Sequence, residues 1–135
     1  MKKITSFIVE DNINALNLLC NDLNQYHEEI EIIGKATSVV EALKKLQKAY
    51  KNDKNNPDIL NYLGFTLRKT GKLEEAEKYY LAGLKIKPDH NGINEYLGEL
   101  YVNTGRMELA KERLAVLKNC NCEEYSELKE IIEKE

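Results

Sequence analysis

Apolar residues in the C-terminal two thirds of the chain recur at helical spacing, and the pattern repeats after 34 residues. Leu63-Gly64 returns as Leu97-Gly98, and Ala76 returns as Ala110. Residues three or four positions apart share one face of a helix, so residues 57–118 read as two helix-turn-helix units. Glycine inside a helix costs about 1 kcal/mol relative to alanine. We therefore expect close packing at each Leu-Gly pair, with Ala76 and Ala110 as the matching small residues.

Glycine and proline mark the breaks between these helices. Thr70-Gly71-Lys72 supplies a residue that adopts positive φ, and Lys87-Pro88-Asp89 ends the following helix. Asn56-Pro57-Asp58 offers a cap and a proline for the first turn of the first helix. The positions predicted to be buried are Leu60, Leu63, Leu67, Ala76, Tyr80 and Leu84 in the first unit, and Leu97, Tyr101, Ala110, Leu114 and Leu117 in the second.

A last helix is predicted over Glu123 to Glu133. Tyr125, Leu128, Ile131 and Ile132 lie on one side of it. Stacked repeats need a terminal element that covers the last apolar face. We expect this helix to be that cap.

Residues 41–118 resemble the tetratricopeptide repeat family. The resemblance rests on Leu63-Gly64, Leu67, Ala76, Tyr80 and Pro88 in one unit, and on Leu97-Gly98, Tyr101 and Ala110 in the next. Gly83 departs from the alanine usual in the family, and no proline closes the last unit. The resemblance implies a helical array that binds a protein or peptide with its first helices.

The first 40 residues follow a different pattern. Ile4 to Val9 is a run of β-branched and aromatic residues, which predicts a strand buried on both faces. A helix with Asn12 as its cap follows, and His27-Glu28-Glu29 breaks it. Ile30 to Ala36 predicts a second strand, parallel to the first, and Val40 to Tyr50 a second helix. The apolar face of the first helix is expected to contain Ile13, Leu16, Leu19, Leu23 and Tyr26.

Residues 1–45 resemble the first βαβα of a response-regulator receiver domain. The similar residues are Ile4–Val9 followed by Glu10-Asp11, then Glu31–Ala36 leading to Glu41-Ala42-Leu43. In that family the acidic pair holds Mg²⁺ beside a phosphorylated aspartate. The phosphoacceptor position falls on Leu63 here, so the resemblance implies the fold without the activity.

Together these patterns predict an α+β chain that is mostly α. A partial βαβ segment of receiver (flavodoxin-like) type over residues 1–40 precedes helical repeats and a capping helix over residues 41–135. The helix Val40–Tyr50 is expected to serve both parts, because Ala42, Leu46 and Ala49 are in phase with the repeats. The junction is compatible with a natural gene fusion and with an engineered recombinant.

Composition argues against several functional classes. The net charge is −3, so no basic field favours nucleic acid or anionic membrane. No apolar run approaches the ~20 residues of a membrane helix, and the N-terminus lacks the features of a signal peptide. The expected location is cytoplasmic, and an odd count of three cysteines suits a reducing compartment.

Few residues suggest chemistry. Glu10 and Asp11 are a weak candidate Mg²⁺ pair without an obvious third ligand, and no other cofactor is implied. Cys120 and Cys122 are expected to be ordinary thiols in a turn, and Cys20 a small core residue. His90 is expected to be a surface turn residue. No nucleophile elbow or phosphate loop appears, so we expect no enzymatic activity.

The best candidate site is the inner face of the repeats. Phe65 with Arg68 and Lys69 offers an apolar anchor beside two cations, suited to a short acidic or C-terminal peptide. The alternatives are a solvated face without function, a receiver remnant that responds to Mg²⁺ or a phosphoryl donor, and a homodimer formed through the open edge of the first strand. The resemblance to repeat proteins places Asn61, Phe65, Arg68, Lys69, Glu95, Glu99 and Asn103 on the ligand side, with Asp58 and Val102.

Overall fold

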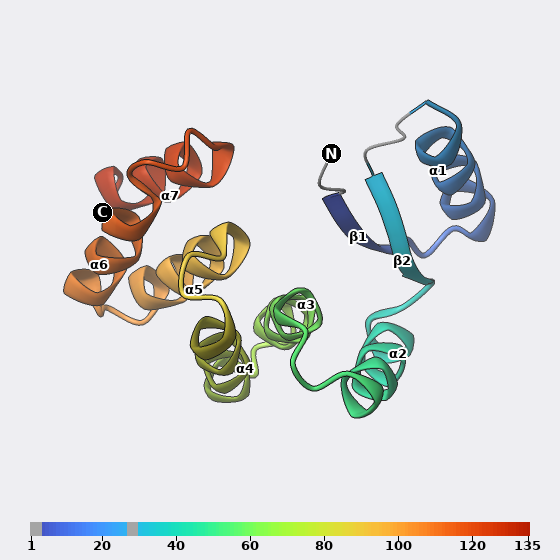
Figure 1. The fold of residues 1–135 in the computed structure, drawn as a ribbon, viewed down its shortest axis with the longest axis horizontal. Helices are drawn as coiled ribbons and strands as arrows, with labels where there is room; N and C mark the ends of the chain where they lie inside the picture. Colours follow the sequence, from blue (N-terminus) through green and yellow to red (C-terminus); the bar gives the residue numbers. More distant parts are fainter. Residues whose placement is uncertain (1–3, 27–29) are drawn as a thin grey trace. The chain divides into compact units, whose positions relative to one another are not determined.

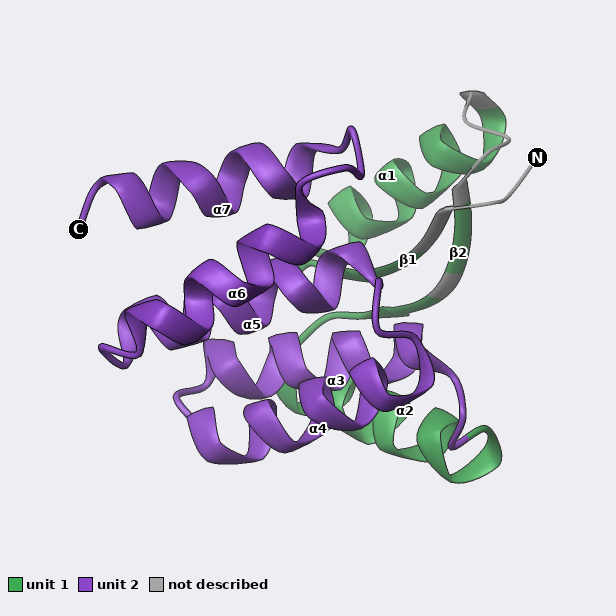
Figure 2. Ribbon diagram, turned by 60° about the vertical axis from the view of Figure 1, so that its left-hand side comes forward, with its two compact units in different colours: residues 1–53 green, residues 54–135 purple. Residues whose placement is uncertain are grey.

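The computed structural model describes residues 4–26 and 30–135, which form two strands and seven helices (Figure 1). The chain divides into two compact units, Met1–Asp53 and Lys54–Glu135 (Figure 2). The elements are β1 (Ile4–Val9), α1 (Ile13–Tyr26), β2 (Ile30–Ala36), α2 (Val39–Asn52), α3 (Pro57–Lys69), α4 (Leu73–Ile86), α5 (Asn91–Asn103), α6 (Met107–Leu117) and α7 (Glu123–Glu133). The predicted order of elements is confirmed throughout the described residues. The predicted helix break at His27–Glu29 lies outside them.

The first unit contains the predicted parallel pair of strands. β1 and β2 run from Ile4 opposite Ile30 to Val9 opposite Ala36, with a shift of register after Ser6. At that shift Gly34 of β2 lies against the Phe7 ring, where a Cβ atom would come within 2.5 Å of the ring edge. The absence of a side chain at Gly34 therefore leaves room for the Phe7 ring.

The prediction that β1 is buried on both faces is wrong. Ser6, Phe7 and Ile8 are half-buried, and Val9 is 44% exposed. The reason is that the described sheet has two strands, and both α1 and α2 pack on β2.

The apolar face predicted for α1 is only partly buried. Leu16 and Cys20 are buried, which confirms Cys20 as a core residue, and its thiol is free. Ile13 and Leu19 remain largely exposed. A helix packed mainly on one strand covers a narrower stripe than one packed on a complete sheet.

Helix α2 starts at a well-formed cap. The Ser38 hydroxyl accepts a hydrogen bond from the Glu41 amide, and the Glu41 carboxylate accepts from the amide and hydroxyl of Thr37. A hydrogen bond from Lys45, with those from Thr37, lowers the pKa of Glu41 to about 2. All of α2 belongs to the first unit, so its additional role in the repeats remains a prediction.

The second unit is built from the two predicted helix pairs. α3 packs with α4 and α5 with α6, while α5 also contacts α4 and α3. Gly71 and Gly105 make the turns, with φ values of 81° and 73°. Every position predicted to be buried is buried except Leu114, which is half-buried.

The glycines inside α3 and α5 do mark close packing, but not against the expected partners. A Cβ atom on Gly64 would lie 2.4 Å from the Tyr80 ring, and one on Gly98 would lie 2.5 Å from Leu128. Large side chains thus occupy the space beside each glycine. Ala76 and Ala110 are buried, yet they are not the closest neighbours of the glycines.

The terminal helix α7 has the predicted bounds and packs on α5 and α6. Leu128 is fully buried, and Tyr125, Ile131 and Ile132 are half-buried. The predicted cap is therefore confirmed. In the described part of the chain, no helix is long and apolar enough to cross a membrane.

Two predictions about single residues in this unit are wrong. Cys120 and Cys122 form a disulfide, because the turn between α6 and α7 brings their Cα atoms to 5.2 Å. His90 is buried: it forms the N-cap of α5, and its ring lies within hydrogen-bond distance of Asp58 in α3.

Candidate functional site

The predicted ligand face is formed by α3 and α5, whose side chains meet at a constant sequence offset. The rings of Phe65 and Tyr96 lie 4.9 Å apart between centroids, and Arg68 forms an ion pair with Glu99 at 2.6 Å. Each pair is separated by 31 residues, and each helix contributes residues one turn apart. The face is therefore a short aromatic and charged stripe along two neighbouring helices.

Arg68 is more enclosed than the sequence predicted. Its guanidinium carbon lies 5.6 Å from the Phe65 ring centroid and 5.4 Å from that of Tyr96. The Arg68 side chain is only 8% exposed, and its Glu99 partner is 18% exposed. Burial, followed by the charges of nearby glutamates, raises the pKa of Tyr96 to about 12. Arg68 thus links two repeats, and Glu99 already balances its charge.

Lys69 is the accessible cation of this face. Its side chain is exposed, and the ammonium lies 5.3 Å from the Phe65 ring centroid. Within residues 4–26 and 30–135 it takes part in no ion pair shorter than 4 Å. Phe65 itself is half-buried, so part of its ring faces solvent beside this charge.

Two further predicted residues lie at opposite ends of the stripe. Asn61 is 7% exposed, and its Oδ1 atom has no hydrogen-bond partner among the described residues. Its amide nitrogen lies over Gly92, where a Cβ atom would come within 2.8 Å. Asn103 is exposed at the last position of α5.

Glu95 occupies a different environment from the other predicted residues. It is 4% exposed and faces Glu127 of α7. Burial, with a hydrogen bond and repulsion from Glu127, raises its pKa from 4.5 to about 9. Glu95 is therefore protonated at neutral pH and acts in the contact between α5 and the terminal helix.

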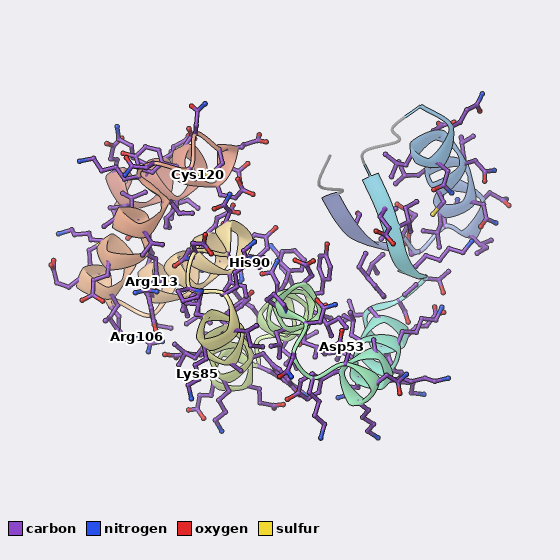
Figure 3. The ribbon with its side chains drawn as sticks, viewed as in Figure 1. Asp53, Lys85, His90, Arg106, Arg113 and Cys120 are labelled. Carbon is purple, nitrogen blue, oxygen red and sulfur yellow. A yellow bond between two sulfur atoms is a disulfide. The ribbon has the colours of Figure 1, made fainter. Side chains whose placement is uncertain are left out.

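Sequence reasoning missed the polar links between successive repeats. His90 Nδ1 accepts a hydrogen bond from the Ile93 amide at 3.1 Å, so its Nε2–H donates to Asp58 at 2.8 Å. Figure 3 labels His90 at the start of α5. The sequence signal was its place immediately before a predicted helix, where caps occur.

A second polar link joins α4 to the residue that precedes α6. Arg106 donates from both terminal nitrogens to the two carboxylate oxygens of Glu77 at 2.9 Å and stacks on Tyr101. A shallow cleft of about 650 Å³ lies beside this pair. The cleft is lined by Gly71, Lys72, Leu73, Glu74, Glu75, Glu77, Thr104 and Arg106.

The acidic pair of the first unit forms a capping turn. Glu10 accepts a hydrogen bond from the Asn12 amide, and Asn12 in turn caps α1 through Asn14 and Ala15. Asp11 is exposed. The described residues contain no cluster of three side chains suited to a metal ion.

Comparisons with known proteins give similarities to two relatives and a match to one family model. The chain is 28% identical over 105 residues to the protein O-mannosyl-transferase TMTC3 of Homo sapiens, and 32% identical over 102 residues to the TPR repeat-containing protein PA4667 of Pseudomonas aeruginosa. These alignments cover 78% and 73% of this chain but only 11% and 16% of the two relatives. Residues 45–78, from within α2 to within α4, match the family model of the tetratricopeptide repeat. The similarity to this family therefore concerns residues 45–78 of the chain.

Proposed function

We propose that this chain is a non-catalytic protein-interaction module that binds a peptide segment on the α3–α5 face. The observation that carries the proposal is the partly exposed ring of Phe65, held against Tyr96 and beside the exposed ammonium of Lys69. The repeat at residues 45–78 supports it, because proteins of this family commonly bind other proteins.

The side chains of the face favour one class of ligand. An apolar side chain can pack on Phe65, and a carboxylate one or two residues away can pair with Lys69. Arg68 is a poorer second cation, because a ligand would have to displace Glu99 from it. The ligand we expect is thus a peptide with one acidic group beside an apolar residue.

A displayed library of random peptides, selected on the whole chain, tests this function. Selected peptides should contain the apolar-acidic pair and should bind at least about tenfold more weakly to Phe65→Ala and Lys69→Glu, a loss near 1.4 kcal/mol. Leu81→Ala, at an exposed position of α4, is the matched control and should bind normally. Equal binding by all three variants would rule out this face.

We also propose that β1 pairs with a second copy of the chain. In the described sheet β1 has one neighbouring strand, and Val9 at its end is exposed. An open edge offers unpaired backbone groups to another strand. Sedimentation equilibrium should detect a dimer that Val9→Lys weakens and that Val40→Lys, on exposed α2 surface, does not. A monomer over the full concentration range would contradict the pairing.

For the receiver-like segment we propose a structural remnant without phosphoryl transfer or a functional Mg²⁺ site. The βαβα order supports the likeness, and Leu63 at the acceptor position lies buried in α3. Incubation with acetyl phosphate and Mg²⁺ should leave the mass of the intact chain unchanged. An added phosphoryl group on an aspartate would support the alternative of a responsive receiver.

A further inference from the structure

The turn between α6 and α7 carries a chemical feature that peptide binding does not use. Cys120, which is labelled in Figure 3, forms a disulfide with Cys122 across a single residue, and both side chains are partly accessible. Between them Asn121 has a φ of 51°, in the left-handed region, which asparagine tolerates better than most residues. The chain therefore turns within this small ring.

This ring lies next to the first residue of the terminal helix. Cys122 is the N-cap of α7, and its side chain makes no capping hydrogen bond there. The first amides of a helix have no partner within the helix, and they stabilise a negative charge at the cap. A thiolate at Cys122 would accept a hydrogen bond from them, although Glu123 and Glu124 in the first turn oppose that charge.

The position of α7 controls contacts on α5. Leu128 lies in the space beside Gly98, and Glu127 faces the buried Glu95. The turn at 118–122 is the covalent connection between α6 and this cap. A change in the conformation of this turn would therefore change how α7 packs on α5.

From this placement we infer that Cys120 and Cys122 are a reversible thiol–disulfide site for small thiols, and that its state controls how firmly α7 packs on α5. The inference goes beyond peptide binding and does not depend on the proposed ligand face.

Glutathione would reduce the disulfide in two exchange steps. A glutathione thiolate attacks Sγ of Cys120, the Cys120–Cys122 bond breaks, and Cys122 leaves as a thiolate that takes up a proton. A second glutathione thiolate attacks the mixed disulfide at the glutathione sulfur, releasing oxidised glutathione and the Cys120 thiolate, which is protonated. Two electrons pass to the protein pair, and two glutathione molecules are oxidised.

The test uses the whole chain equilibrated at several ratios of reduced to oxidised glutathione. Trapping with N-ethylmaleimide and peptide mapping by mass spectrometry gives the thiol content of each cysteine, with buried Cys20 as an internal reference. We expect the disulfide fraction to follow the ratio. A pair that stays reduced in oxidised glutathione alone, or stays oxidised in a large excess of reduced glutathione, would overturn the assignment.

Hydrogen exchange on the same samples measures the effect on α7. Reduction should accelerate exchange of amides 123–133 by roughly three- to tenfold, and leave α3 and α4 unchanged. The double variant Cys120→Ser/Cys122→Ser should match the reduced protein at every ratio, and Cys20→Ala should behave as wild type. If the double variant does not fold, the oxidised and reduced wild-type proteins still decide the matter. Equal exchange of α7 in those two states would overturn the proposed control.

Discussion

At the scale of single residues, two glutamates of α5 that are one turn apart lie in different environments. Arg68 forms an ion pair with Glu99 and lies close to two aromatic rings. Glu95, four residues before Glu99, is held protonated by burial and by Glu127. Residue type and helical phase do not distinguish these states, because neighbouring helices determine them.

Glu95 predicts a dependence of stability on pH. Its folded pKa of about 9 exceeds the unfolded value of 4.5. The folded chain binds more protons between these values, so this contribution is complete below pH 4.5 and is lost as pH rises towards 9. Glu95→Gln, which cannot ionise, should raise the free energy of unfolding at pH 8 by on the order of 1 to 3 kcal/mol in urea titrations.

Glu130→Gln is the matched control on the exposed side of α7. A hydrogen bond from Lys134 lowers the pKa of Glu130, the opposite direction to Glu95. Because this pair is fully exposed to solvent, the change should have little effect on stability. Identical pH profiles for Glu95→Gln and wild type would contradict the assignment of a protonated Glu95.

Gly64 gives a second prediction at this scale, with an unusual sign. Alanine normally stabilises a helix relative to glycine by about 1 kcal/mol. At Gly64 the added Cβ would meet the Tyr80 ring at 2.4 Å, so Gly64→Ala should instead destabilise by about 1 to 3 kcal/mol. Thermal unfolding measures the effect. A variant as stable as wild type would show that the Tyr80 ring can move aside at little cost.

At the scale of elements, local sequence signals were sufficient to predict the order of the helices and strands and the approximate residues where they begin and end. Gly71 and Gly105 sit at the predicted turns, and α7 has the predicted ends. Contacts between elements were less predictable. The exposure of Val9 reflects which helices cover which strand, and the space beside Gly98 is filled by α7, 30 residues away. Periodicity identifies a buried face but not its partner.

The same limits apply to the candidate site. Phe65 and Lys69 were found because the helical phase of a known repeat places them on one face. The Arg68–Glu99 pair and the His90–Asp58 hydrogen bond depend on distances between helices, which spacing along the chain does not encode. The disulfide was missed because a turn geometry, rather than a cysteine count, decides whether two neighbouring cysteines bond.

The terminal helix supplies the prediction at this scale. Leu128 is its one buried side chain within the described residues, so Leu128→Ala should cost about 2 to 4 kcal/mol and speed amide exchange across α7. Ile132→Ala, at a half-buried position, should cost clearly less. If both variants lose the same stability, α7 is not anchored through Leu128.

At the scale of the molecule, the chain joins two units of different architecture. A parallel βαβα segment precedes paired helices, and the repeat match begins within α2, the last helix of the first unit. Most of the buried apolar residues lie in the repeat unit, whereas the first unit leaves Ile13, Leu18 and Val40 more than half exposed. We expect amides of the first unit to exchange faster than amides of the repeat unit in hydrogen-exchange experiments. Exchange that is uniform across residues 4–26 and 54–135 would contradict this order.

The most direct test of the central claim is an NMR titration of the whole chain with a peptide from the library selection. Binding on the proposed face should shift amide resonances along α3 and α5, with the largest changes near Phe65, Lys69 and Tyr96. The same titration of Phe65→Ala should show small shifts at equal peptide concentration. Shifts confined to α4, α6 or residues 4–53, with α3 and α5 unchanged, would contradict the account.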